Sequence, residues 1–303
     1  MTIKSVSLIG LGALGVLFGH QLSQKVADFT VVADQARIDR YVKDGIYSNG
    51  EKCEFRYAVP KHTDRPADLI IFAVKYNSLD EAIEVVRGRV GEHTILLSLL
   101  NGISSEEVIG NAFGINKVVY CVAEQMDAVK VGNRLIYANK GKLVFGDKQP
   151  GVITENVRAV DEFLSAAEIP HTIETQMIKK LWSKFMVNVG VNQVVAVYGD
   201  HYADIQKPGV PRDMMIAAMR EVMALSEKEG IYLNETDFEY WMNVLDSINP
   251  EGKPSMRQDV ESKRLSELEL FAGTVLRLGR KHHLKMPVNA MLYEEMKKIE
   301  STY

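Results

Sequence analysis

The feature that most constrains this chain is a glycine-spaced turn between a short apolar run and a helical pattern near the N-terminus. The segment SVSLIGLGALGVLFGHQLSQ places Gly10, Gly12 and Gly15 in a G-x-G-x-x-G pattern at this junction. The first glycine permits a tight turn, the second lets a diphosphate approach the backbone, and the third lets a helix pack closely on a strand. We therefore expect a strand–turn–helix unit whose helix N-terminus binds phosphate.

A second apolar run, DFTVVAD, follows the first helical pattern and ends on Asp34. An acid at this distance from the glycines accepts a hydrogen bond from the ribose 2′-hydroxyl of NAD. Arg37 and Arg40 follow within two helical turns and could instead reach the 2′-phosphate of NADP, although a solvated helix face accounts for them equally well. The residues expected to bind a dinucleotide in this segment are Gly10, Leu11, Gly12, Ala13, Leu14, Gly15, Asp34 and Arg37.

The rest of the N-terminal half alternates apolar runs with helical patterns, whereas the C-terminal half is helical almost throughout. The segments ADLIIFAVK, TILLSLLNG and KVVYCVAEQ have the near-continuous apolar character of buried strands. Such strands, alternating with helices, are typical of a parallel sheet that is covered on both faces. The expected fold class is α/β, with a Rossmann-type doubly wound parallel sheet in residues 1–172 and an all-helical domain in residues 173–303.

Three long helices are expected in the second half of the chain, besides the one expected in residues 179–199. Their patterns cover residues 211–230, 234–248 and 255–283, and Asn234 is a plausible N-cap for the second. The third pattern lies between Pro254 and Pro287. Ser255 stands three residues before Gln258, which is the spacing of a capping box at a helix start.

The segment KKLWSKFMVNVGVNQVVAVYG combines an apolar surround with a regular series of polar residues. Lys184, Asn188 and Asn192 are spaced by four, which places them on a slowly winding ridge along one helix. Buried polar groups require partners, and these partners are either a ligand or other protein groups. Amides both donate and accept hydrogen bonds, so such a ridge can hold the hydroxyl and keto oxygens of a small substrate.

Composition excludes several classes of function and supports others only weakly. The chain is 46% hydrophobic and 25% charged with a formal net charge of -4, which argues against a general nucleic-acid or acidic-membrane binder. Two cysteines, Cys53 and Cys121, lack the spacing of a metal site or a disulfide framework. No apolar run reaches the length of a membrane span. We expect a cytoplasmic protein without a bound metal.

Several motifs occur in a fixed order along nearly the whole chain. They are GLGALG at the start, AVK ending on Lys75, LNG containing Asn101 and Gly102, LWSKFMVNVGVN, and SMRQDVESKRLSELELFAG. Together they resemble the ketopantoate reductase family. The resemblance implies NADPH-dependent reduction of the ketone of ketopantoate to (R)-pantoate, on the route to pantothenate and coenzyme A. It also implies a Rossmann domain followed by a helical domain similar to that of the 6-phosphogluconate dehydrogenases.

The resemblance also implies roles for individual residues. Lys184 matches the proton-donating lysine and Glu267 the active-site glutamate. Asn188 and Asn192 match substrate-binding asparagines, and Ser255 matches the serine that binds the substrate carboxylate. The cofactor-side residues are Lys75 and Asn101, of which Asn101 lies beside the nicotinamide and the substrate.

The desolvation of a lysine lowers its pKa toward neutrality, which suits a proton donor, and its positive charge stabilises a forming alkoxide. Each remaining assignment has a simpler alternative: Ser255 as an N-cap, Asn101 as part of an Asn-Gly turn, and Glu267 in an intrahelical pair with Lys263 or Arg264.

The chain departs from the family pattern at three informative positions. Gln193 follows Asn192 where proline is frequent, Ala272 precedes Gly273 where asparagine is usual, and Asp34 ends the second strand where the best-known members carry arginine. NADPH is the cofactor that the resemblance implies, and Asp34 keeps NAD open. There are two alternative functions: a reductase of another 2-keto acid, and a non-catalytic dinucleotide-binding protein that senses redox state. The methionine-rich helical half is compatible with a homodimer.

Overall fold

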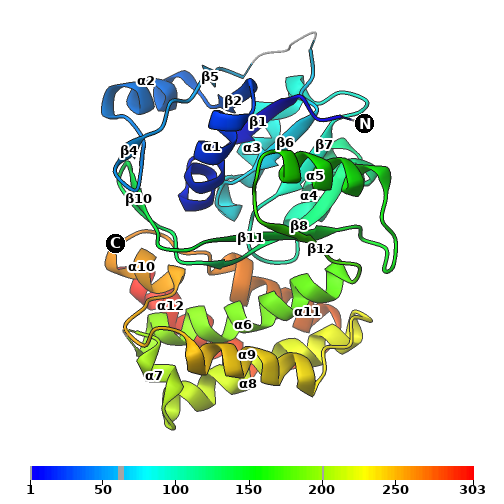
Figure 1. Cartoon of the computed structure of the whole chain (residues 1–303). Helices are drawn as coiled ribbons and strands as arrows, with labels where there is room; N and C mark the ends of the chain where they lie inside the picture. Colours follow the sequence, from blue (N-terminus) through cyan, green and yellow to red (C-terminus); the bar gives the residue numbers. More distant parts are fainter. Residues whose placement is uncertain (1, 61–64, 200) are drawn as a thin grey trace. The chain divides into compact units, whose positions relative to one another are not determined.

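The computed structural model describes residues 2–60, 65–199 and 201–303. The chain divides into two compact units, Met1–Ile178 and Lys179–Tyr303, which run from blue to green and from green to red in Figure 1. The boundary expected from the sequence, between residues 172 and 173, lies a few residues before this division. Each unit is described by itself below.

The first unit contains an eight-stranded sheet. In spatial order its strands are β12 (His171–Ile173), β11 (Lys140–Gly146), β8 (Val118–Met126), β7 (Ile95–Ser98), β6 (Leu69–Phe72), β1 (Ser5–Ile9), β2 (Asp28–Val32) and β5 (Tyr57–Ala58). The pairs β5–β2, β2–β1, β1–β6, β6–β7, β7–β8 and β11–β12 of this sheet are parallel. The pair β8–β11 is antiparallel. The expected α/β class, with a mainly parallel sheet in the first unit, is confirmed.

Helices alternate with the parallel strands of this unit, as the sequence predicts. They are α1 (Ala13–Lys25), α2 (Gln35–Asp44), α3 (Leu79–Val86), α4 (Ser105–Phe113) and α5 (Glu155–Ala166), with 3-10 turns at η1 (Tyr76–Ser78), η2 (Arg87–Arg89) and η3 (Ile115–Lys117). Helix α2 illustrates both kinds of boundary. Asp34 is its N-cap, and Gly45, with φ +67, ends it because glycine adopts this conformation without steric cost.

A smaller four-stranded sheet, in the order β4-β3-β10-β9, accompanies the large one. It consists of β3 (Tyr47–Ser48), β4 (Glu51–Lys52), β9 (Val129–Val131) and β10 (Arg134–Ile136). The core of the unit is formed by strand residues that alternate on the sheet and by residues of α1 and α5. Examples that are fully or almost fully buried are Phe18, Leu69, Leu97 and Phe145.

The second unit is helical, as expected. Its helices are α6 (Met177–Tyr198), α7 (Ala203–Gln206), α8 (Val210–Lys228), α9 (Glu235–Ser247), α10 (Ser255–Glu261), α11 (Thr274–Lys281) and α12 (Pro287–Glu300), of which α6 starts in the last residues of the first unit. A Cβ atom at Gly190 of α6 would lie 2.6 Å from the Cγ atom of Met219 in α8, so these two helices pack closely. Within the described residues, no helix combines the length and apolar character that crossing a bilayer requires.

The single helix expected over residues 255–283 is wrong. Helix α10 ends at Glu261, and the amides of Lys263 and Arg264 donate back to the carbonyls of Val260 and Asp259. This is a Schellman-type ending in which Lys263, with φ 48, occupies the left-handed position that glycine usually fills. A π-helical turn (Glu269–Gly273) then leads into α11. The stop was missed because the sequence offers no glycine or proline at the break.

Replacing Lys263 with glycine is expected to stabilise the protein. A non-glycine residue in the left-handed region costs about 1 kcal/mol, and glycine removes this cost, less the entropy that it adds to the unfolded chain. Urea unfolding should show a higher midpoint for Lys263→Gly. Ser262→Gly is the matched control, because Ser262 has φ -87 and gains nothing from glycine. Equal shifts in the two variants would contradict this explanation of the helix end.

Candidate functional site

The glycine-spaced turn is held in a conformation that only glycine fits. Gly10 has φ +95, and a Cβ atom there would lie 2.6 Å from the carbonyl oxygen of Ala73. A Cβ atom at Gly15 would lie 2.0 Å from the carbonyl oxygen of Gly10. Gly12 is the N-cap of α1, and it brings no side chain to cap the helix. The first amides of α1 and its dipole therefore suit an anionic ligand.

The strand ends place further predicted residues at the same edge of the sheet. Strands β1, β6 and β7 are parallel neighbours, so Gly10, Lys75 and Asn101 all follow carboxyl ends that meet at this edge. The chain order reverses between β1 and β6, and ligands of open α/β sheets bind at such a switch point. Lys75 is exposed and Asn101 is half-buried. Gly102, with φ +90, completes a turn after β7.

A buried polar cluster beneath the Asn101 turn was missed by the sequence reasoning. The hydroxyls of Ser98 and Ser105 lie 2.8 Å apart, and Ser105 Oγ donates to Glu106 Oε2 at 2.9 Å. The amide of Leu100, one residue before Asn101, donates to Ser98 Oγ at 3.3 Å. Glu106 shares a helix face with Ile109 and Gly110, and this spacing was the available signal that the acid is buried.

Burial raises the pKa of Glu106 from its ordinary value of 4.5 to about 7, although hydrogen bonds from Ser105 and from the backbone oppose this rise. A carboxyl with a raised pKa binds its proton more tightly in the folded state. Its contribution to stability is therefore fully present below about pH 4.5 and is lost as the pH rises through about 7. The cluster under the Asn101 turn is thus most stable when Glu106 is protonated.

The variant Glu106→Gln tests this assignment. Its free energy of unfolding, relative to the wild type, should rise by up to about 3 kcal/mol between pH 5 and pH 8, because glutamine stays neutral. Urea unfolding at the two pH values measures the difference. Glu107→Gln is the control on the same helix, since Lys148 lowers the pKa of exposed Glu107 and its contribution is not lost as the pH rises. If the free energy of unfolding of Glu106→Gln, relative to the wild type, is the same at pH 5 and at pH 8, then Glu106 is charged in the folded protein.

Asp34 and Arg37 form an ionic cluster with Glu81 of α3. Asp34 Oδ1 accepts from the amide of Arg37 at 2.8 Å, and Asp34 Oδ2 lies 3.1 Å from Arg37 Nη1. The same guanidinium donates to both carboxylate oxygens of Glu81, at 2.7 and 3.3 Å. The pKa of Arg37 is raised, first by the hydrogen bond with Glu81 and then by the charges of both carboxylates. All three side chains are partly exposed.

In the second unit, the structure brings Asn188, Asn192 and Ser255 together. Asn192 is buried, and its Nδ2 atom donates to the carbonyl oxygen of Asn188 at 3.2 Å. Its Oδ1 atom accepts from Ser255 Oγ at 3.0 Å and from the amide of Met256 at 3.3 Å. Asn192 therefore fixes the start of α10. The N-cap of α10 is Pro254 rather than Ser255, so the capping box that the spacing suggested is absent from this described segment.

Lys184 and Glu267 are both half-buried in the second unit. Glu267 lies in the bend before the π-helical turn, where its carbonyl oxygen accepts from the amide of Phe271. The expected intrahelical pair of Glu267 with Lys263 or Arg264 requires one continuous helix through these residues. The helix is broken at residues 262–266, so this helical spacing is absent. Arg264 Nε lies 3.1 Å from Asp259 Oδ1, which closes the end of α10.

Gln193, which replaces the frequent proline, belongs to a buried network on another side of α6. Its Nε2 atom donates to the carbonyl oxygen of Val189 at 2.8 Å and to Asn289 Oδ1 at 3.0 Å. Asn289 in turn donates from its Nδ2 atom to Glu221 Oε2 at 2.7 Å. Glu221 also accepts from the amides of Val288 and Asn289 at the start of α12. Gln193 thus connects α6 with α8 and α12.

Replacing Gln193 with leucine should destabilise the second unit by about 1–3 kcal/mol, because Asn289 Oδ1 loses its donor while it stays buried. Thermal unfolding measures the loss. Tyr198→Leu, at an exposed position of the same helix, is the control and should leave stability almost unchanged. A Gln193→Leu variant as stable as the control would show that the network contributes little.

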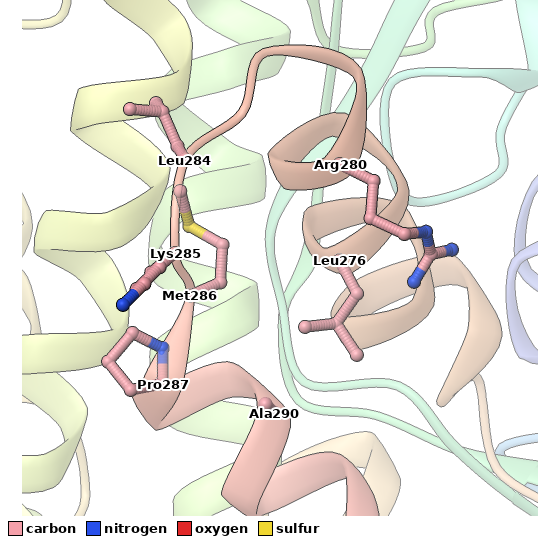
Figure 2. Close-up of a pocket in the computed structure, with 7 residues that line it drawn as sticks. All are labelled: Leu276, Arg280, Leu284, Lys285, Met286, Pro287 and Ala290. Carbon is pink, nitrogen blue, oxygen red and sulfur yellow. The ribbon is translucent and has the colours of Figure 1, made fainter.

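A surface pocket of about 320 Å³ lies at the junction of α11 and α12, and it contains none of the predicted site residues. Figure 2 shows its lining of Leu276, Arg280, Leu284, Lys285, Met286, Pro287 and Ala290. The charged ends of Arg280 and Lys285 extend to opposite sides of this view. A ligand pocket usually has a few polar groups that converge on it, and this one lacks such a group among the described residues.

Comparisons with known proteins agree on one family. A family model described as "Ketopantoate reductase PanE/ApbA" matches residues 6–150, and its C-terminal counterpart matches residues 176–300. The 2-dehydropantoate 2-reductase of Streptococcus pyogenes serotype M1 is 24% identical over 294 residues, which are 95% of either chain.

Two solved structures share the fold at 20% sequence identity. A ternary structure of D-mandelate dehydrogenase with NADH and anilino(oxo)acetate has a TM-score of 0.86, with 98% of this chain and 99% of that chain covered. A dimeric ketopantoate reductase from Staphylococcus aureus has a TM-score of 0.77 with the same coverage.

Proposed function

Since the chain belongs to the ketopantoate reductase family, we propose that it reduces the ketone of 2-dehydropantoate to (R)-pantoate with a reduced nicotinamide dinucleotide, in the biosynthesis of pantothenate and coenzyme A. The observation that carries the proposal is the presence, in one chain, of the glycine turn of the first unit and the Lys184–Asn188–Asn192 ridge of the second. A redox sensor would need the turn alone. The ridge therefore favours a reductase over a sensor.

The first unit holds the dinucleotide in this proposal. The amides at the start of α1 bind the diphosphate, because Gly12 leaves them accessible and the helix dipole favours negative charge. Lys75 and Asn101, at the ends of β6 and β7, position the nicotinamide half. When bound, the reduced nicotinamide supplies the hydride.

The second unit binds the 2-keto acid and supplies the proton. Lys184 Nζ donates a proton to the carbonyl oxygen as the hydride reaches the keto carbon, and its charge stabilises the developing alkoxide. Asn188 holds the substrate hydroxyl, and Glu267 orients it. Ser255 binds the carboxylate at the start of α10 by turning its hydroxyl, which donates to Asn192 Oδ1 in this structure, toward the substrate.

The variant Lys184→Ala should lower turnover of ketopantoate by about 10²–10⁴-fold, the usual range for a general acid. Absorbance of the reduced nicotinamide follows turnover, and a fluorescence titration should show that dinucleotide binding is kept. Lys179→Ala, on the same helix, is the control, because Lys179 pairs with Asp237 instead. Wild-type turnover in Lys184→Ala would exclude Lys184 as the proton donor.

A second substrate class deserves direct comparison. The structural similarity to D-mandelate dehydrogenase favours a test of aromatic 2-keto acids. The kcat/KM values for ketopantoate and phenylglyoxylate, measured with one enzyme preparation, decide between the two. A higher value for phenylglyoxylate would replace the main proposal by its alternative.

The proposal includes an assembly and a location. The dimeric ketopantoate reductase from Staphylococcus aureus, which shares the fold, supports a homodimer. The proposed biosynthetic reaction implies the cytoplasm. The partner is a small 2-keto acid, without nucleic acid, membrane or metal.

A further inference from the structure

The dinucleotide-binding unit contains a guanidinium that is shared between two carboxylates near the end of β2. Asp34 ends the segment that follows β2 and caps α2, and Glu81 stands in the first turn of α3. Arg37 lies between them, with Nη1 3.1 Å from Asp34 Oδ2 and 2.7 Å from Glu81 Oε1. The three side chains form a carboxylate–guanidinium–carboxylate cluster, with one net negative charge.

This cluster is suited to a ribose diol. A carboxylate has about four lone-pair positions, and Asp34 uses one oxygen for the amide of Arg37 and the other for its guanidinium. It therefore keeps capacity to accept from a hydroxyl. An acid at the end of the second strand of a dinucleotide-binding fold accepts from the ribose 2′-hydroxyl in this way.

The same cluster disfavours the 2′-phosphate of NADPH. It brings roughly two negative charges next to Asp34 and within reach of Glu81, and like charges disfavour each other. Arg37 directs Nη1 and Nη2 at Glu81, and the charges of the two carboxylates exceed that of its guanidinium, so it attracts a phosphate strongly only if it leaves Glu81. Arg40, one turn further along α2, is exposed.

We propose that Asp34, Arg37 and Glu81 make this protein selective for NADH over NADPH, with Glu81 as the specificity-determining residue. The family resemblance implies NADPH, and the geometry of this chain points the other way. The inference rests on the proposed function only in requiring that a nicotinamide dinucleotide binds. Glu81 acts by holding the guanidinium that a 2′-phosphate would need.

Equilibrium binding tests the proposal without turnover. NADH and NADPH are titrated separately against the purified protein, and the fluorescence of the reduced nicotinamide gives each Kd at low and moderate ionic strength. ADP-ribose and its 2′-phosphate, measured by calorimetry, isolate the adenosine end. The wild type should bind NADH at least about tenfold more tightly than NADPH, and added salt should narrow the gap because it screens the carboxylates.

The variant Glu81→Gln releases Arg37 and removes one negative charge. Its Kd for NADPH should fall about tenfold, while its Kd for NADH changes less than about twofold. Glu84→Gln is the matched control, because Glu84 lies on the same helix but pairs with Arg87. Adding Arg37→Ala to Glu81→Gln should abolish the gain for NADPH, which shows that the released guanidinium is responsible.

Two results would overturn the proposal. One is a wild type that binds NADPH as tightly as NADH. The other is that Glu81→Gln and Glu84→Gln lower the Kd for NADPH by the same factor. This would show that Glu81 acts only through its negative charge and not by holding Arg37. Failure of the proposed function is distinct, since it appears as selective NADH binding without any reduction of a 2-keto acid. Binding of neither dinucleotide overturns both.

Discussion

The close approach of Gly15 to Gly10 is the constraint on which the first unit depends. No side chain fits at Gly15, because its Cβ atom would lie 2.0 Å from the carbonyl oxygen of Gly10. The contact lets α1 start directly above the end of β1 and leaves the N-terminus of α1 open. The parallel pairing of β1 with β6, and of β6 with β7, then places Lys75 and Asn101 at the same edge. The proposed dinucleotide site follows from this single turn and the direction of three strands.

In the second unit, one buried helix carries polar residues with two different purposes. Asn192 contacts Asn188 and the start of α10, which is where the proposed substrate residues gather. Gln193, the next residue, contacts Asn289 and through it Glu221. A step of about 100° along a helix separates the two networks. The departure at Gln193 thus concerns how α6 is anchored to α8 and α12.

Local patterns predicted the parts of the molecule that depend on neighbouring residues. The glycine turn and the strand–helix alternation are short-range features, and the sequence predicts them well. The family resemblance and the fold class are confirmed by the family models and by the structure. The assignments of catalytic and substrate-binding residues stay predictions.

The features that the sequence did not predict depend on contacts between distant residues or on unusual backbone conformations. Glu81 is 44 residues from Arg37, and Ser255 is 63 residues from Asn192, so no local pattern joins them. The break after α10 needs Lys263 in a left-handed conformation that propensity disfavours. The burial of Glu106 conflicts with the usual exposure of an acid in the first turn of a helix.

The most direct test of the central claim is the fate of the hydride. The protein is mixed with ketopantoate and a reduced nicotinamide dinucleotide that carries deuterium at the transferable position, and the product is analysed by mass spectrometry and NMR. The account predicts pantoate with one deuterium on the carbon that bore the ketone. Unchanged ketopantoate, or pantoate without deuterium at that carbon, would contradict it.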